Sequence, residues 1–158
     1  MSIFILLKLT LQRKFRNEQQ KKSGPSYFYP MNYSVHFLEK QQDFDQIMQS
    51  IADAPWIGFD TEFVGEKTYI PVLCLLQIIA GNSIYLVDTL EITNLDAFLD
   101  IVEDPKVLKI THAGDNDYRL LYTLFGAVPS NTFDTQIAAG FVGYNYPAGF
   151  GKIVEKEM

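Results

Sequence analysis

Strand-like and helix-like hydrophobic patterns alternate along the chain from Met31 onward. Some segments carry apolar side chains at helical spacing, and others are short apolar runs bounded by Gly, Pro or Asn. The pattern predicts, in chain order, a helix marked by Phe44, Ile47, Met48 and Ile51, strands at 56–63, 72–80 and 83–88, a helix marked by Leu95, Phe98, Leu99 and Val102, a strand at 107–111, a helix capped by Asp115 or Asn116, and a helix at 132–142. Because Gly81-Asn82 separates two of the strands, they should form a hairpin. The order predicts an α/β fold with a mixed central sheet flanked by helices.

The size and composition of the chain exclude several classes of protein. With 158 residues, 47% of them hydrophobic, it can form one domain with a substantial core and is not a disordered chain. No apolar run reaches the roughly 18 residues of a spanning helix, so no membrane span is expected. The single cysteine, Cys74, should be a buried hydrophobe and forms no internal disulfide. A lone thiol favours a reducing compartment, and we expect a cytoplasmic location.

Charge divides the chain into two parts. Residues 1–31 carry six Lys or Arg against one Glu, a net charge of +5, and contain the breaker Ser23-Gly24-Pro25. We expect this segment to be a basic, disordered leader. Residues 32–158 carry seven basic and eighteen acidic side chains, a net charge of −11. This balance argues against broad, nonspecific nucleic-acid binding and leaves room for a carboxylate site that recruits metal cations.

Motifs for nucleophilic catalysis and phosphate loops do not occur in the sequence. There is no Gly-x-Ser-x-Gly elbow, no phosphate loop and no Gly-x-Gly-x-x-Gly motif. The two histidines, His36 and His112, lack the spacing of metal ligands. Nucleophilic catalysis by serine or cysteine is therefore unsupported.

Asp60 and Glu62 form the first candidate site. Side chains alternate across a strand, so these two should share one face while Thr61 points away. Two acids on an otherwise apolar strand are costly unless something pairs them, and no Lys or Arg occurs between residues 41 and 66. A divalent cation such as Mg²⁺ or Mn²⁺ would satisfy both carboxylates. The alternative is a solvent-exposed strand end with hydrated acids.

A second candidate site follows the strand at 107–111. Residues 112–118 read His-Ala-Gly-Asp-Asn-Asp-Tyr and open a predicted helix. Ligands of α/β sheets usually bind at strand ends of this kind. The alternative is that Asp115 and Asp117 only cap the helix and interact with its dipole. Asp88 and Asp134 are interpreted as structural, because one ends a strand and the other opens a helix.

Several blocks, taken together and in order, resemble ribonuclease D and its relatives. The first exonuclease motif of that family is similar to Trp56-Ile57-Gly58-Phe59-Asp60-Thr61-Glu62-Phe63. Its second motif is similar to Lys109-Ile110-Thr111-His112-Ala113-Gly114-Asp115-Asn116-Asp117. Further similar segments are Leu73-Cys74-Leu75-Leu76-Gln77-Ile78, Ile84-Tyr85-Leu86-Val87-Asp88 and Phe133-Asp134-Thr135-Gln136-Ile137-Ala138-Ala139. The resemblance runs from about Val35 to the end of the chain.

The resemblance implies a ribonuclease H-like exonuclease fold and a site that uses two divalent metal ions, Mg²⁺ or Mn²⁺. Carried over by position, the catalytic residues and metal ligands are Asp60, Glu62 and Asp117. The residues implied to contact substrate are Thr61 and Phe63, which would flank the terminal nucleotide, and His112, which would lie near the scissile bond.

One family feature does not occur in this sequence. The third exonuclease motif, Tyr-x-x-x-Asp, supplies a fourth carboxylate, and none of the nine tyrosines has Asp at that offset. The residue four positions after Tyr144 is Ala148, and that after Tyr146 is Phe150. We therefore expect residues 32–158 to be the N-terminal portion of an exonuclease domain, incomplete at the C-terminus and truncated before its third motif.

The function implied by the resemblance is 3′–5′ exoribonuclease activity on the single-stranded 3′ ends of tRNA and other structured RNA. An exonuclease needs a chain end rather than a base sequence, which is compatible with the absence of a base-reading motif. Two alternatives remain. One is a DNA-directed 3′–5′ exonuclease of the same superfamily, and the other is a non-catalytic fragment that binds nucleic acid or a protein partner. Protein partners and oligomeric state do not follow from the sequence.

Overall fold

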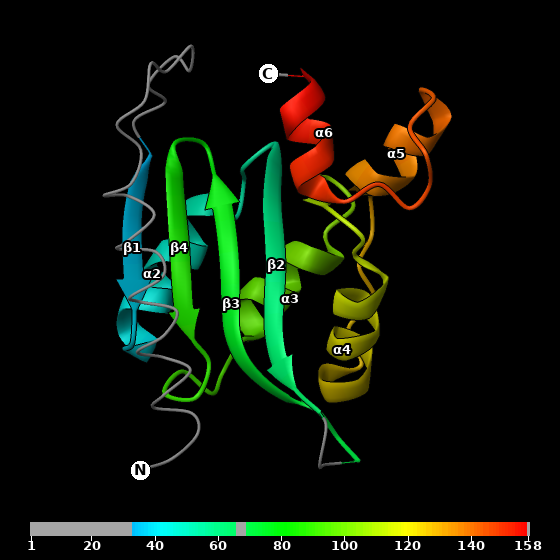
Figure 1. The fold of residues 1–158 in the computed structure, drawn as a ribbon. Coiled ribbons are helices and arrows are strands. Elements are labelled where there is room, and N and C mark those ends of the chain that lie inside the picture. The colour runs from blue at the N-terminus through cyan, green and yellow to red at the C-terminus, as the bar shows by residue number, and fades with distance from the viewer. Residues whose placement is uncertain (1–32, 66–68, 158) are drawn as a thin grey trace, which may run out of the picture. The chain divides into compact units, whose positions relative to one another are not determined.

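The computed structural model describes residues 33–65 and 69–157 (Figure 1). The leader expected at residues 1–31 lies outside these residues. None of the helices described is both long and apolar enough to cross a membrane. The elements, in chain order, are β1 (Ser34–Leu38), α2 (Gln41–Ile51), β2 (Trp56–Val64), β3 (Val72–Ala80), β4 (Ser83–Asp88), α3 (Asp96–Glu103), β5 (Leu108–Thr111), α4 (Asp115–Phe125), β6 (Thr132–Asp134), α5 (Thr135–Phe141) and α6 (Phe150–Glu157).

Six strands form one mixed sheet in the order β1-β4-β3-β2-β5-β6. The central strands β2, β3 and β4 are antiparallel neighbours, which confirms the hairpin predicted at Gly81-Asn82. The outer pairs β1–β4, β2–β5 and β5–β6 are parallel. The predicted α/β fold with a mixed sheet and flanking helices is therefore confirmed.

The hydrophobic core lies on one face of this sheet. In β2, the side chains of Ile57, Phe59 and Thr61 are buried, whereas Asp60 and Glu62, which alternate with them, are exposed. The Phe59 ring packs edge-on against Phe98 of α3 at a centroid separation of 5.5 Å. Helices α2 and α3 lie behind the strands in Figure 1 and cover the core face. The alternation places the two acids on the opposite face, as expected from the sequence.

Cys74 of β3 is 8% exposed, which confirms the prediction of a buried thiol. Burial raises the pKa of this thiol above its usual value. A raised pKa keeps the side chain protonated at neutral pH, and the thiolate is the reactive form. Cys74 therefore acts as a core residue rather than as a nucleophile.

Three elements were not expected from the sequence. The short strands β1 and β6 form the two edges of the sheet, and α6 ends the described chain.

The predicted helix at 132–142 is wrong at its start, because residues 132–134 pair with β5 and the helix begins only at Thr135. Asp134 caps this helix, which confirms its structural interpretation. The helix expected to be capped by Asp115 or Asn116 begins at Asp115, and neither residue is its cap, since that position is held by Gly114.

A buried lysine links β5 to the end of α3. Lys109 is 0% exposed, and its Nζ donates hydrogen bonds to the carbonyl oxygens of Ile101, Asp104 and Val107 at 3.4, 2.5 and 2.7 Å. Burial lowers the pKa of this amine. The ammonium group satisfies carbonyls at a helix C-terminus, where a cation is favoured by the helix dipole.

Replacing Lys109 with Met should destabilise the fold. The substitution keeps the apolar stem but leaves buried carbonyls without their donor, which costs about 1–3 kcal/mol. The free energy of unfolding, measured by urea titration, tests this. Lys106→Met removes the same charge from an exposed position nearby and should change stability by no more than about 0.5 kcal/mol. Equal losses in the two variants would contradict the role given to Lys109.

Candidate active site

Asp60 and Glu62 lie on the sheet face opposite the core. Both belong to β2, and the strand register places Asp60 opposite Gln77 of β3. The amide Nε2 of Gln77 donates a hydrogen bond to Oδ2 of Asp60 at 3.3 Å. The strand pairing shifts register just after Glu62, before Phe63. The sheet thus holds two carboxylates on one surface with an amide as the neighbour of the first.

Asp117 approaches these acids through a split in the sheet. β2 pairs with β5 only as far as Gly58, so the edge of β2 beyond that residue is open. In the first turn of α4, Asp117 reaches this edge, and its Oδ1 accepts a hydrogen bond from the Thr61 N–H at 3.0 Å. The same oxygen accepts a bond from the Thr61 hydroxyl. Asp117, 56 residues away in sequence, therefore binds the residue between Asp60 and Glu62.

Asp60 lies in the electrostatic field of the other two carboxylates. The pKa of Asp60 is raised, first by burial and then by the negative charges of Asp117 and Glu62. Burial also raises the pKa of Asp117, and the hydrogen bonds from Thr61 oppose this rise. The negative potential at this place would favour a bound cation.

The donor set has the chemistry of a Mg²⁺ or Mn²⁺ site, because hard carboxylate oxygens are the ligands such ions prefer. Among residues 33–65 and 69–157, however, no three Asp, Glu, His or Cys side chains are arranged as a metal-ligand cluster. Asp117 is instead engaged with Thr61, because its Oδ1 accepts hydrogen bonds from the Thr61 N–H and hydroxyl. The residues fit a metal by donor type and charge, although their side chains do not converge as a ligand cluster.

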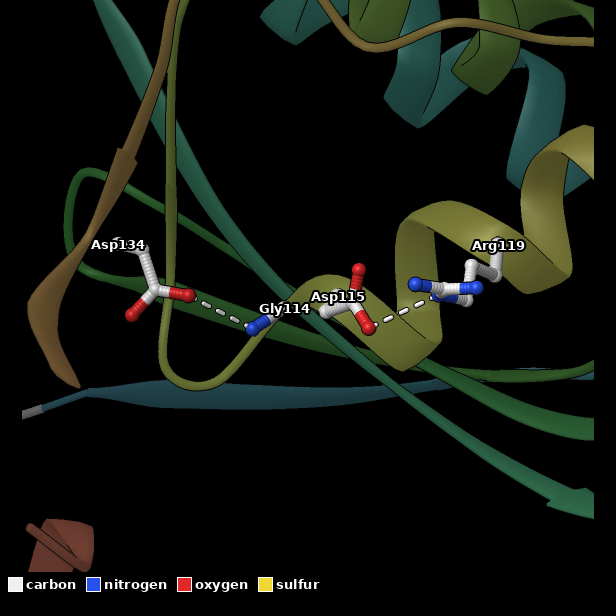
Figure 2. Close-up of polar contacts among 4 residues, drawn as sticks. All are labelled: Gly114, Asp115, Arg119 and Asp134. Carbon is white, nitrogen blue, oxygen red and sulfur yellow. Dashed lines mark hydrogen bonds and ion pairs between the residues drawn. The ribbon is translucent and has the colours of Figure 1, made fainter. Parts of the chain in front are cut away.

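The turn before α4 is held by Asp134, the capping residue of α5. Its Oδ2 accepts a hydrogen bond from the Gly114 N–H at 2.8 Å, as Figure 2 shows. Its Oδ1 accepts bonds from the N–H groups of Ala113, Gln136 and Ile137 at 3.1, 2.8 and 3.2 Å. Ala113 has a φ of +58°, a conformation that is unfavourable for a residue with a side chain. One carboxylate thus fixes both a strained turn and the start of α5.

Gly114 is required in this turn because a side chain there has no room. A Cβ atom would lie 2.5 Å from Oγ1 of Thr111 and 3.0 Å from Cζ of Tyr118. The hydroxyl groups of these two residues are hydrogen-bonded to each other at 2.6 Å. Gly114→Ala should destabilise the protein by about 1–3 kcal/mol, since overpacking of a tight contact costs this much. Thermal or urea unfolding would measure it. Gly149→Ala is the matched control, because nothing lies within 4 Å of the added atom there, and a comparable loss in that variant would contradict the argument.

A cavity of about 460 Å³ adjoins Asp60. Much of its wall is apolar, and Asp60, Gln77 and His112 contribute its ionisable and amide groups. The His112 ring lies edge-on to Phe150 of α6, with a centroid separation of 5.4 Å. The residues that line the cavity are Gly58, Phe59, Asp60, Gln77, Ile78, Ile79, Ile84, Ile110, Thr111, His112, Thr135 and Phe150.

Only some of the expected site residues line this cavity. Asp60 and His112 line the cavity, whereas the buried Thr61 is committed to Asp117 through its N–H and hydroxyl. Phe63 lies beyond the register shift of β2 and is 40% exposed. The cavity residues that sequence reasoning missed include Gln77, Thr135 and Phe150. Gln77 alone had a signal, since it is the polar residue within an apolar strand that pairs with the strand of Asp60.

Comparisons of sequence bear directly on this site. A family model described as 3′–5′ exonuclease matches residues 35–158. The chain is similar to ribonuclease D of Escherichia coli, with 35% identity over 126 residues, covering 80% of this chain and 33% of that protein. It is also similar to ribonuclease D of Gluconacetobacter diazotrophicus, with 36% identity over 117 residues, covering 72% of this chain and 29% of that protein. The chain thus spans about a third of the length of these curated relatives.

Solved structures give the same result for the fold. The crystal structure of Escherichia coli RNase D matches with a TM-score of 0.72 and 34% identity, covering 80% of this chain and 33% of that one. The catalytic core of RRP6 from Trypanosoma brucei matches with a TM-score of 0.64 and 26% identity, covering 77% of this chain and 34% of that one. The match of the family model to most of the chain, together with these likenesses, shows that the chain belongs to the 3′–5′ exonuclease family.

Proposed function

We propose that the protein containing this chain is a hydrolytic 3′–5′ exoribonuclease, and that Asp60, Glu62 and Asp117 are its catalytic carboxylates. The observation that carries the proposal is the placement of these acids, drawn from β2 and α4 and linked by the hydrogen bonds of Asp117 to Thr61, beside a cavity that Asp60 lines in a 3′–5′ exonuclease fold.

The proposed cofactors are two divalent metal ions, Mg²⁺ or Mn²⁺, held by Asp60, Glu62 and Asp117. When bound, such ions activate a water molecule and stabilise the negative charge that develops on the attacking and leaving oxygens of a phosphodiester. The chain's own contribution is to position the ligands. The sheet orients Asp60 through Gln77, and the Thr61 N–H and hydroxyl hold the Asp117 carboxylate at the edge of β2.

RNA is the proposed substrate, with its single-stranded 3′ end bound in the cavity beside Asp60. The support comes from relatives, because the curated proteins above are ribonucleases D and the E. coli enzyme is described as an exoribonuclease involved in structured RNA processing. Processing of tRNA and a cytoplasmic location belong to the same proposal, and the lone buried thiol Cys74 fits a reducing compartment. A DNA strand is the alternative substrate.

The test is the shortening of 5′-labelled single-stranded RNA by the complete protein with Mg²⁺ or Mn²⁺. Stepwise loss of nucleotides from the 3′ end, abolished by a chelator, is expected. A DNA strand of the same sequence should be shortened more slowly, and preference for DNA would favour the alternative. Internal cleavage, or binding of RNA without hydrolysis, would contradict an exonuclease. The latter result would instead favour a non-catalytic binding fragment.

A further inference from the structure

Two neighbouring residues select the tautomer of the neutral His112 ring. The hydroxyl of Thr135 donates a hydrogen bond to the carbonyl oxygen of Thr111 at 3.0 Å. The same hydroxyl oxygen lies 2.9 Å from Nδ1 of His112. A hydroxyl has one hydrogen, and here it is used by the carbonyl, so Nδ1 must be the donor in its contact with Thr135. The neutral ring therefore carries its hydrogen on Nδ1, and Nε2 is a hydrogen-bond acceptor.

Nε2 of His112 is a buried acceptor with no hydrogen-bond partner among the described residues. Buried polar atoms nearly always have a partner, and one left without any points to a ligand or another missing donor. His112 lines the cavity beside Asp60, and the ring of Phe150 lies against it. Phe150 is 60% exposed. The ligand that satisfies Nε2 must supply a hydrogen-bond donor.

The other groups that line the cavity restrict the chemical class of the ligand further. The polar part of the cavity is rich in hydrogen-bond acceptors, because it contains the Asp60 carboxylate and Nε2 of His112. The side-chain amide of Gln77 turns its NH₂ group to Asp60, so its carbonyl oxygen is a further acceptor. The apolar part of the cavity, which includes Ile79, Ile84 and Phe150, suits the flat face of a base. A ribonucleoside has this division, since its base is largely flat and its ribose hydroxyls are donors. A fully ionised phosphate group offers only acceptors and does not satisfy Nε2 of the neutral ring.

We propose that Nε2 of His112 accepts a hydrogen bond from a ribose hydroxyl of the 3′-terminal nucleoside, and that His112 is thereby a sugar-recognition residue of this site. The inference rests on the proposed function for the location of the 3′ end beside Asp60. It adds a specific contact that selects the sugar. Thr135 is the positioning residue of this contact because it holds His112 in the tautomer that can accept.

Binding of nucleoside monophosphates to the 158-residue protein tests the proposal without requiring turnover. Affinities for adenosine 5′-monophosphate and its 2′-deoxy and 3′-deoxy forms are measured by calorimetry with Mg²⁺. One of the deoxy forms should bind about 3- to 10-fold more weakly than the ribose form, the effect of one net hydrogen bond. His112→Leu should bind that deoxy form and the ribose form equally. A penalty for the 2′-deoxy form would mean selection of RNA, and one for the 3′-deoxy form recognition of the chain end.

Two further variants and a spectroscopic measurement keep the test decisive. ¹⁵N NMR of the two histidines should show Nδ1–H in His112, and Nε2 should shift when adenosine monophosphate binds. Thr135→Val keeps the imidazole, removes the group that holds its tautomer, and should reduce sugar discrimination even if His112→Leu does not fold. His36→Leu, on the edge strand β1, should leave all three affinities unchanged.

Three results would overturn the inference. The first is that the unchanged protein binds all three nucleotides equally. The second is that discrimination between them persists in both His112→Leu and Thr135→Val. The third is that the protein does not bind adenosine monophosphate. The proposed function is decided separately by metal-dependent shortening of RNA. The proposed function can be correct even if His112 does not recognise the sugar, so the two failures are distinguishable.

Discussion

Replacing Asp60 with Asn should abolish binding of Mn²⁺ and reduce exonuclease activity of the complete protein by roughly a thousand-fold or more. Asn has nearly the same size and still accepts the hydrogen bond from Gln77, so the sheet is preserved. What it removes is the negative charge that lies within the influence of both Glu62 and Asp117. Calorimetry with Mn²⁺ measures the first effect, and shortening of 5′-labelled RNA measures the second.

Two aspartates on α4 provide a matched comparison for this prediction. Asp117 is 6% exposed and bonded to Thr61, whereas the side chain of Asp115 is 75% exposed and pairs with Arg119 at 2.8 Å (Figure 2). Asp117→Asn should greatly weaken Mn²⁺ binding while retaining an oxygen that can accept from Thr61. Asp115→Asn should leave Mn²⁺ binding unchanged, because an exposed ion pair contributes little. Equal effects at the two positions would contradict the assignment of Asp117 as a ligand.

Most of the fold could be predicted because its central strands and helices carry strong periodic signals. β2, β3 and β4 are long, apolar and separated by turn residues, and α2 shows one buried face. The edge strands lack such signals. Four of the five residues of β1 are exposed, and β6 has only three residues. Their strand conformation comes from pairing with β4 and β5, which no local pattern contains.

The candidate site could be predicted only in part. Strand alternation placed Asp60 and Glu62 on one face, since the side-chain period of a strand is fixed. The hydrogen bonds of Asp117 to Thr61 could not be foreseen, because they join residues 56 positions apart across the split between β2 and β5. The link from Thr135 to His112 likewise depends on how α5 packs beside β5. Sequence patterns identify which residues carry the chemistry, and tertiary packing decides how they are oriented.

Asp134 makes more hydrogen bonds than the helix cap that the local sequence indicates. As a helix cap it would accept bonds from Gln136 and Ile137 alone, yet it also binds the N–H groups of Ala113 and Gly114. Burial by itself would raise the pKa of this carboxyl, but the four N–H donors bring it below its usual range. A lowered pKa means that the folded state favours the charged form. The ionised carboxylate therefore stabilises both the turn before α4 and the start of α5.

Asp134→Ala should lower the free energy of unfolding at neutral pH by about 2–4 kcal/mol, since it removes a helix cap and leaves further N–H groups without an acceptor. The pH dependence has a definite sign. Because the folded-state pKa is depressed, the contribution of Asp134 is complete above the unfolded-state pKa and is lost as pH falls through the folded-state value. The difference between the native chain and Asp134→Ala in urea unfolding should therefore be largest at neutral pH and shrink in acid.

The same substitution should also weaken Mn²⁺ binding, because the turn at Ala113 and Gly114 leads directly into the first turn of α4, which carries Asp117. Asp96→Ala is the matched control, since it removes an exposed acid from the first turn of α3 and should not change metal binding. If Asp134→Ala destabilises the fold but leaves Mn²⁺ affinity intact, Asp117 is held in place by Thr61 alone. If the stability difference persists unchanged into acid, the stabilising form of Asp134 is not the carboxylate.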